Sequence, residues 1–175
     1  DINGEALAGI AVKFRRKGTR VHTYVYDVSD QQKVEETAKQ VIEEVGHIDI
    51  LVNNAGIGYS GELAETTLGS WKKLIDVNFW GPLYHIYAYL PSMKEMRKGQ
   101  IVNVSSGQAF FRLPTWGAYA SIKLALGAFS EILGFELRRY NIKLTTVYPF
   151  MVNTPFYKEI EGETFLGRLA MKLVP

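Results

Sequence analysis

The first apolar residues of the chain recur at helical spacing, and a basic run with a glycine follows them. This pattern predicts an amphipathic helix that begins near Asn3 and ends before Gly18. Its apolar positions are Leu7, Ile10, Ala11 and Phe14. A second helical stripe follows Ser29 and Asp30, either of which can cap the helix, and it ends at Gly46. That stripe consists of Val34, Ala38, Val41, Ile42 and Val45.

Short runs rich in β-branched and aromatic residues alternate with helical patterns along the chain. The predicted elements after the first helix are strand 20–26, helix 30–45, strand 48–53, helix 70–96, strand 100–105, helix 117–140 and strand 143–148. Strand 48–53 is too uniformly apolar to leave one face in water, which is typical of a parallel sheet. Because the chain contains no internal repeat or interdomain linker, we expect a single α/β domain over residues 1–175.

Each predicted strand is followed by small or polar residues. These are Asp27, Asn53-Asn54, Ser105-Ser106 and Pro149. In open parallel sheets, ligands bind at the carboxyl ends of the strands. We therefore expect the chemistry of the protein at this edge of the sheet.

Composition excludes several other classes of site. The chain of 175 residues has a formal net charge of +2, which does not indicate a nucleic-acid surface. It has no cysteine, so disulfides, a thiolate nucleophile and a cysteine zinc site are excluded. His22, His47 and His85 lack the spacing of metal ligands, so we expect no metal site. The most apolar stretch, residues 79–91, is too short to span a bilayer, so we predict no transmembrane helix.

Tyr119 and Lys123 stand four residues apart on a predicted helix and therefore share one of its faces. An ammonium group near a phenol lowers a phenol pKa that is ordinarily about 10, so Tyr119 could exchange a proton near neutral pH. Ser106, thirteen residues before Tyr119, could hydrogen-bond the same substrate oxygen. By themselves, however, such a tyrosine and lysine are more often a packed aromatic ring and an amine that extends to solvent.

Several further segments accompany this pair in a fixed order. They are Asn53-Asn54-Ala55-Gly56, Asn78 in Asp76-Val77-Asn78-Phe79-Trp80-Gly81, Ser106, Tyr119-Ala120-Ser121-Ile122-Lys123, and Pro149 with Val152 and Thr154. In these segments the chain resembles the short-chain dehydrogenase/reductase family, and the resemblance covers essentially its whole length. It implies a Rossmann-like, doubly wound parallel sheet in three α/β/α layers. It also implies an NAD(P)-dependent oxidoreductase that interconverts a secondary alcohol and a ketone or aldehyde by hydride transfer.

The resemblance also implies a role for each matching residue. Tyr119 would be the general acid/base, Ser106 would orient the substrate oxygen, and Asn78 would position a water in the proton relay. Lys123 would lower the pKa of the tyrosine and hold the nicotinamide ribose. Without the resemblance, the favoured interpretation of Asn78 is a polar residue that satisfies a backbone group.

Cofactor contacts are implied at ten positions. These are Asp1, Asp27, Val28, Asn54, Gly56, Tyr119, Lys123, Pro149, Val152 and Thr154. Asp27 and Val28 match the pair that lines the adenine pocket, Asn54 and Gly56 the adenosine side, and the residues after Pro149 the nicotinamide carboxamide. Asp1 stands where members that prefer NAD carry an acid for the ribose 2′-hydroxyl, so we expect NAD rather than NADP. Asp27 could instead be a helix cap, and Asp1 merely a chain end.

The chain departs from the family pattern in two places. The first strand of the family and its glycine-rich Thr-Gly-x-x-x-Gly-x-Gly turn have no counterpart, so we expect the parent protein to extend beyond both ends of this chain. In the family's strand order 3-2-1-4-5-6-7, the chain supplies strands 3 to 6, and the centre of the sheet would lack a strand. Phe150 also replaces the usual glycine after Pro149, which changes the expected seating of the nicotinamide.

Bulky apolar residues cluster in the two segments that flank the substrate in the family. They are Phe110, Phe111, Trp116, Phe150, Met151, Phe156 and Tyr157. They favour a bulky apolar substrate, such as a steroid, a retinoid or a lipid-derived carbonyl compound, although core packing explains many of them equally well. Residues 163–175 have helical spacing and could cover the substrate or contact a membrane surface.

The same residues are compatible with other functions. An epimerase or dehydratase could use the same tetrad, and a non-catalytic dinucleotide sensor or scaffold could keep the fold. The helices that carry Asn78 and Tyr119 have broad apolar faces, and in the family that the chain resembles these helices pack across a dimer interface, so the resemblance implies a homodimer or homotetramer. A cytoplasmic location is the default expectation, and nothing in the sequence fixes the compartment.

Overall fold

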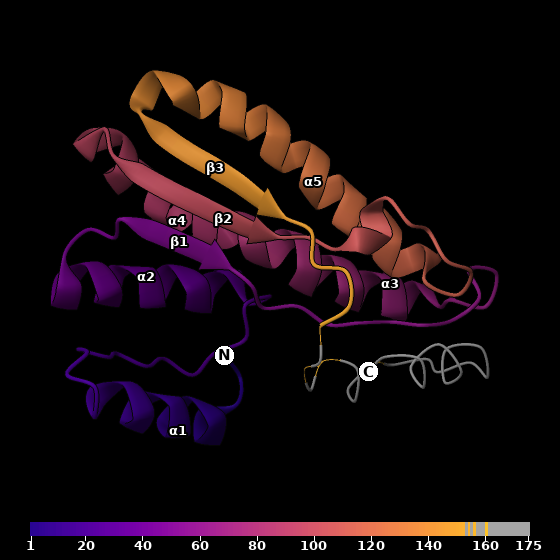
Figure 1. The fold of residues 1–175 in the computed structure, drawn as a ribbon, viewed down its shortest axis with the longest axis horizontal. Helices are drawn as coiled ribbons and strands as arrows, with labels where there is room; N and C mark the ends of the chain where they lie inside the picture. The colour runs from indigo at the N-terminus through magenta and orange to yellow at the C-terminus, as the bar shows by residue number, and fades with distance from the viewer. Residues whose placement is uncertain (153, 155, 157–159, 161–175) are drawn as a thin grey trace.

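The computed structural model describes residues 1–152, 154, 156 and 160 (Figure 1). Its helices are α1 (Gly4–Arg15), α2 (Gln31–Val45), α3 (Leu68–Ile75), η1 (Asp76–Trp80), α4 (Gly81–Met96), η2 (Gly107–Ala109), α5 (Gly117–Leu137) and η3 (Arg138–Tyr140). Its strands are β1 (Ile50–Asn53), β2 (Gly99–Val104) and β3 (Ile142–Val147). They form a parallel sheet in the order β1-β2-β3. The predicted α/β parallel architecture is therefore confirmed.

The helix boundaries follow the capping residues that the sequence indicates. The Asn3 side chain accepts a hydrogen bond from the Ala6 amide, and Asp30, rather than Ser29, accepts one from the Lys33 amide. Gly46 follows the end of α2. The sequence predicts one long helix over 70–96. The structure has α3 and α4 instead, separated by the five-residue π-helix η1.

One face of the sheet carries the core. Leu51, Ile101 and Ile142, one from each strand, are buried against side chains from α2, α4 and α5. Figure 1 shows α2 alongside β1, α5 alongside β3, and α4 behind the strands. A wide layer of helices thus covers this face.

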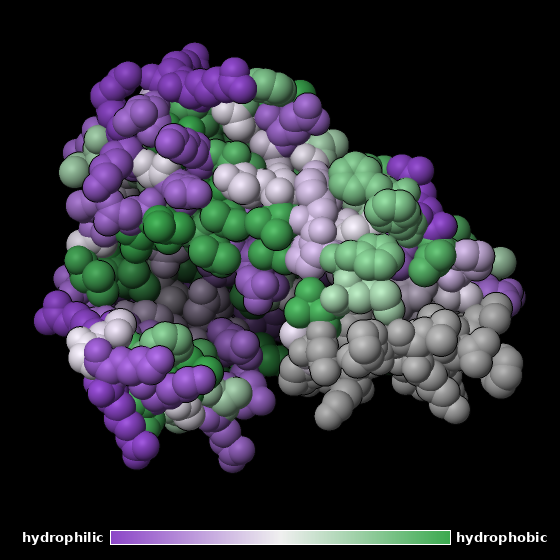
Figure 2. All heavy atoms as spheres, in the orientation of Figure 1, coloured by the Kyte–Doolittle hydropathy of each residue, from purple (hydrophilic) through white to green (hydrophobic). Residues whose placement is uncertain are grey.

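The opposite face of the sheet is open to solvent. Ile50 is 58% exposed and Val52 is 56% exposed, and Figure 2 shows hydrophobic residues over the strands on the face turned to the viewer. The expectation that strand 48–53 is buried on both faces is wrong for these two residues. The physical reason is that none of α2, α4 and α5 packs on their side of the sheet.

Residues 20–26 are extended but do not form the predicted strand. A strand requires a ladder of backbone hydrogen bonds with a neighbour. Among the described residues, the segment makes one backbone–backbone hydrogen bond, from the Tyr26 amide to the Asp1 carbonyl at 3.2 Å. Side chains hold the segment instead: Tyr24 donates a hydrogen bond to Glu44, and the Tyr26 hydroxyl lies 2.7 Å from Nε2 of His85.

Residues 117–140 have the length and composition to cross a membrane. In this fold, however, α5 packs along β3 and buries Ile122, Leu126 and Leu137. One side of this helix thus belongs to the core of the fold.

Candidate active site

The segments that leave the three strands are bound together by hydrogen bonds. At the end of the sheet, Asn53 Nδ2 donates to Asn103 Oδ1 at 2.8 Å. Just beyond β2, the Ser105 amide donates to the Val147 carbonyl and the Gly107 amide to the Pro149 carbonyl, both at 2.8 Å. The carboxyl ends of the strands thus form one connected edge, which is where the sequence places the chemistry.

Asn78 lies in the π-helix η1 and is fully buried. Its Nδ2 atom donates to the carbonyls of Ile57 at 3.0 Å and Leu74 at 3.1 Å, while its Oδ1 atom accepts from the Ile57 amide at 3.2 Å. Both amide hydrogens are therefore used to hold main-chain groups. The side chain fixes the loop after β1 against the helix, and only one lone pair of Oδ1 remains for a water molecule.

Gly56 allows this loop to approach the site closely. A Cβ atom at this position would stand 2.7 Å from Asn78 Oδ1 and 3.4 Å from Lys123 Nζ. The first distance is shorter than a carbon atom and an oxygen atom tolerate. The structure thus brings together Gly56, Asn78 and Lys123, which are far apart in the sequence.

Tyr119 and Lys123 occupy the first turns of α5, and both are buried. Lys123 Nζ lies 5.7 Å from the centre of the Tyr119 ring, so the ammonium is near the phenol, as predicted. The same nitrogen donates to the Val104 carbonyl at 3.0 Å. Burial lowers the pKa of Lys123 from 10.5 to about 8, because a charged group is disfavoured away from water.

Ser106 follows β2 and is buried at the start of η2. Its Oγ atom accepts a hydrogen bond from the Gln108 amide at 3.2 Å. In that bond the oxygen acts as the acceptor, so the hydroxyl hydrogen is still available for donation to a substrate. The Trp116 ring packs edge-on against Tyr119 with 5.6 Å between ring centres, which fixes the orientation of the tyrosine.

The residues expected on the adenine side are placed less uniformly. Val28 contacts the start of α4 at Gly81, whereas the Asp27 carboxylate accepts hydrogen bonds from the amide and the hydroxyl of Ser29. Asp27 therefore acts as a turn cap in this structure. Asp1 accepts a hydrogen bond from the Asn3 amide at 2.9 Å and thereby takes part in the start of α1.

Three other expected cofactor residues, Asn54, Val152 and Thr154, are exposed. Among the described residues, no hydrogen bond or ring contact joins them to Asn78 or Lys123.

Phe150, which departs from the family pattern, lies over Gly107. A Cβ atom on Gly107 would stand 2.9 Å from the Phe150 ring and 3.3 Å from the Pro149 carbonyl oxygen. Phe150 also contacts Phe111 edge-on at 5.6 Å between ring centres, and both rings are exposed. Tyr157 and residues 163–175 lie outside the described residues.

Two residues of the site were not assigned roles from the sequence. Ser105 donates from Oγ to the Lys123 carbonyl at 2.8 Å and so attaches α5 to the end of β2. Gly107 admits the Phe150 ring. The sequence indicates Ser105 only by its place in the serine pair after the strand, because the family motif includes Ser106 alone.

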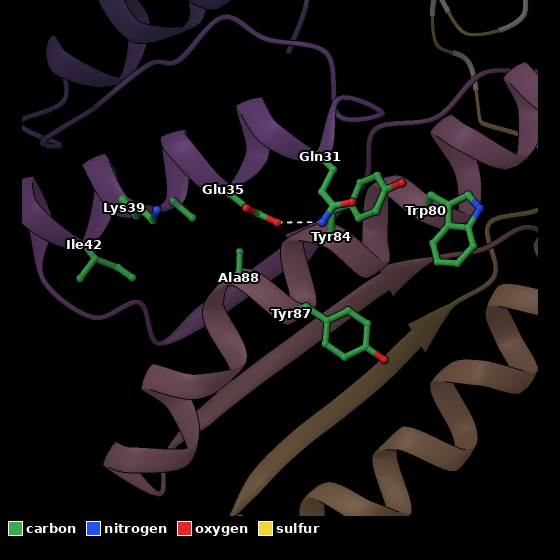
Figure 3. A pocket seen from close by; sticks show the side chains of 9 residues that line it. Gln31, Glu35, Lys39, Ile42, Trp80, Tyr84, Tyr87 and Ala88 are labelled. Carbon is green, nitrogen blue, oxygen red and sulfur yellow. Dashed lines mark hydrogen bonds between the residues drawn. The ribbon is translucent and has the colours of Figure 1, made fainter.

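A groove between α2 and α4 lies apart from these residues (Figure 3). Its volume is about 500 Å³, and Trp80, Tyr84 and Tyr87 line one side of it. Glu35 on the other side accepts a hydrogen bond from Gln31 at 2.8 Å. None of the catalytic candidates lines this groove, so it is not the candidate active site.

Comparison with known families agrees with this geometry. The profile of the short chain dehydrogenase family matches residues 1–164. The chain belongs to this family. The match includes every residue of the candidate tetrad.

Two curated relatives illustrate the similarity. Dehydrogenase/reductase SDR family member 7B of Xenopus laevis is 36% identical over 143 residues, which cover 80% of this chain and 44% of the relative. Human estradiol 17-beta-dehydrogenase 11 is 37% identical over 180 residues, which cover 97% of this chain and 60% of the relative. The chain thus spans about half the length of the curated relatives it matches.

Solved structures show the same fold with either cofactor. An NAD⁺-bound xylitol dehydrogenase has a TM-score of 0.84 and 28% identity, with 99% of this chain and 64% of that chain covered. A gluconate 5-dehydrogenase from Burkholderia cenocepacia J2315, in complex with NADP and tartrate, has a TM-score of 0.85 and 30% identity. In this second case 90% of this chain and 62% of that chain are covered.

Proposed function

We propose that the protein is a nicotinamide-dependent oxidoreductase that interconverts a secondary alcohol and a ketone or aldehyde. The observation that carries this proposal is the state of Lys123, whose side chain is buried beside the Tyr119 ring. Among the described residues it has no carboxylate partner, and a buried charge without one is costly. Packing alone gives no reason to retain such a group, whereas a reaction that needs a cation beside a phenol does.

The residues present fit a nicotinamide dinucleotide. An ammonium group has three hydrogens to donate, and within the described part of the chain Lys123 uses one of them, on the Val104 carbonyl. The other two suit the neighbouring hydroxyls of a ribose. Gly56 allows the loop after β1 to lie close to the same nitrogen. When bound, the nicotinamide would supply the hydride acceptor or donor.

The chain's own residues would then move the proton. In alcohol oxidation Tyr119 would take the proton from the substrate hydroxyl, and in carbonyl reduction it would return the proton to the oxygen. Ser106 would donate its hydroxyl hydrogen to the same substrate oxygen. The positive charge of Lys123 would stabilise the ionised tyrosine. Asn78 would hold the loop after β1 in place and leave one lone pair of Oδ1 for a relay water.

We further propose NAD rather than NADP as the preferred cofactor. The support is the Asp1 carboxylate, which would attract the hydroxyls of an adenine ribose and repel a 2′-phosphate. Asp27 and Val28 would form the wall of the adenine pocket, and Val152 and Thr154 would contact the carboxamide.

The proposed substrate is bulky and apolar. Phe110 and Tyr148 pack at 4.7 Å between ring centres, next to the contact between Phe111 and Phe150. These rings lie on the segments that leave β2 and β3, beside Ser106. Because Phe110, Phe111 and Phe150 are more than half exposed, they offer apolar surface to a ligand. The relative named estradiol 17-beta-dehydrogenase 11 supports a substrate of the steroid class.

We also propose a homodimer or homotetramer assembled through α4 and α5. Both helices carry exposed apolar side chains, which gain by burial against a second copy. These side chains are Tyr87 on α4 and Leu124, Ile132 and Phe135 on α5, together with Trp80 just before α4.

Turnover by the full-length protein tests the proposed function. Nicotinamide absorbance is followed with a panel of apolar secondary alcohols and ketones, using NAD and NADP in turn. Tyr119→Phe should abolish turnover and leave dinucleotide binding intact. Tyr140→Phe is the matched control and should keep full activity. Dinucleotide binding without turnover on the panel would favour a non-catalytic sensor, and absence of both would refute the proposal.

A further inference from the structure

His85 is a buried histidine that the proposed chemistry does not use. It lies on α4, is 9% exposed, and stacks on the Tyr26 ring with 5.8 Å between ring centres. Its Nδ1 atom lies 2.8 Å from the Gly81 carbonyl oxygen, and its Nε2 atom lies 2.7 Å from the Tyr26 hydroxyl.

The direction of both hydrogen bonds follows from chemistry. A carbonyl oxygen can only accept, so Nδ1 of His85 carries the hydrogen, and Nε2 of the neutral ring accepts from the Tyr26 hydroxyl. Burial supports the neutral forms, since it lowers the pKa of His85 and raises the pKa of Tyr26 to about 12. The pair is therefore a fixed, uncharged link between α4 and the segment over residues 20–26.

This link acts directly beside two proposed cofactor contacts. Tyr26 immediately precedes Asp27 and Val28 in the chain. Val28 in turn lies against Gly81, where a Cβ atom would stand 3.1 Å from Val28 Cγ2 and 3.2 Å from its carbonyl oxygen. The first two turns of α4 thus hold this segment on both sides of Asp27.

Other attachments of the segment are few. In the described part of the chain, the Tyr26 amide donates to the Asp1 carbonyl, Arg15 Nη2 donates to the Val21 carbonyl, and Tyr24 and His22 reach Glu44 on α2. The last two contacts hold the beginning of the segment rather than its end. The side chains of Tyr26 and Val28, which flank Asp27, both meet α4.

We propose that Tyr26, His85 and Gly81 form a clamp that positions residues 27–28 to receive the adenine of the dinucleotide. This inference rests on the proposed function. The three residues are positioning residues, because they act through Asp27 and Val28 and touch no reacting atom. The clamp sets affinity for the adenine half of the cofactor and leaves the proton transfer at Tyr119 unchanged.

A matched pair of substitutions in the full-length protein tests the clamp. Tyr26→Phe removes the hydroxyl that donates to His85, whereas Tyr24→Phe removes one that donates to Glu44, and both bonds are 2.7 Å long. Binding of AMP, NAD and nicotinamide mononucleotide is measured for each variant. Only the first two ligands contain adenine.

Tyr26→Phe should weaken AMP and NAD binding about five- to tenfold, the usual effect of one buried hydrogen bond. It should leave the mononucleotide affinity and kcat at saturating NAD within about twofold of the unmodified protein, and Tyr24→Phe should change none of these values beyond that. Gly81→Ala, whose methyl group would press on Val28, should reproduce the selective loss.

Equal effects of the two tyrosine substitutions, or equal losses for NAD and the mononucleotide, would overturn the clamp and leave the proposed function standing. An unmodified protein that neither binds NAD nor turns over would instead refute the proposed function, and the clamp with it.

Discussion

Replacing Lys123 by methionine should stabilise the fold while it abolishes activity. Methionine keeps the length and apolar volume of the lysine side chain but removes its charge. Lys123 is 4% exposed, and within the described part of the chain no carboxylate offsets that charge. If a residue is retained for chemistry at the expense of stability, its replacement should raise the free energy of unfolding and lower activity. If it is retained for packing, its replacement should lower the free energy of unfolding.

The magnitude follows from the pKa. Burial lowers the pKa of Lys123 from 10.5 to about 8, and each pKa unit corresponds to about 1.4 kcal/mol, so charging the folded site costs about 3 kcal/mol. Methionine removes this cost but leaves the Val104 carbonyl without the ammonium, which costs about 1 to 2 kcal/mol. Near neutral pH the variant should therefore be more stable by about 1 to 2 kcal/mol.

The effect should depend on pH with a defined sign. Below about pH 8 the lysine is charged in both the folded and the unfolded chain, so the whole cost is present. Between about 8 and 10.5 the unfolded chain binds more protons than the folded one, so the free energy of unfolding of the unmodified protein rises with pH. The advantage of Lys123→Met should thus shrink by about 2 kcal/mol between about pH 7 and about pH 9.5.

Urea unfolding of the full-length protein at these two pH values measures the difference. Lys143→Met, on an exposed position of β3, is the matched control and should change the free energy of unfolding by less than about 0.5 kcal/mol at either pH. The reasoning would be refuted by a Lys123→Met protein that is less stable than the unmodified protein at neutral pH. A stability difference independent of pH would refute it equally.

Three further predictions address other parts of the structure. Gly56→Ala would place a methyl group 2.7 Å from Asn78 Oδ1, so kcat/KM should fall at least about tenfold in steady-state assays. Asn103→Ala removes a buried side chain that accepts a hydrogen bond from Asn53 and donates one to Ser130. Urea unfolding should therefore show that the free energy of unfolding falls by about 2 to 3 kcal/mol. Because burial lowers the pKa of His85, the free energy of unfolding should fall as pH drops below 6.5, and His85→Gln should reduce that slope in unfolding measured against pH.

The helices and strands were largely predictable because their signals are local. The capping side chains of Asn3 and Asp30 and the apolar stripes of α1 and α2 specify those helices within a few residues. The segment over 20–26 has an equally clear β pattern, yet it pairs with no strand in the part of the chain that the structure describes. A composition rich in valine, threonine and tyrosine favours an extended backbone, but the ladder depends on a neighbour that the local sequence cannot specify.

The catalytic candidates were identified by their motifs, but not the contacts that hold them. Nothing in the spacing of Asn78 indicates that both of its amide hydrogens are donated to main-chain carbonyls. Likewise, nothing in the sequence around Ser105 indicates that its hydroxyl donates to the Lys123 carbonyl. These contacts join residues at least 18 positions apart, or depend on the π-helix, which has no periodic signature.

The π-helix explains why the stretch from Asn78 to His85 connects parts of the site that lie far apart in the sequence. Within it, the Asn78 side chain donates to the Leu74 carbonyl and also holds the loop after β1. A few residues later, Gly81 and His85 hold the segment that ends at Val28. One short piece of helix thus contacts both the segment proposed to serve proton transfer and the segment proposed to bind adenine. Changes at Asn78 should therefore affect turnover, and changes at Gly81 or His85 should affect cofactor affinity.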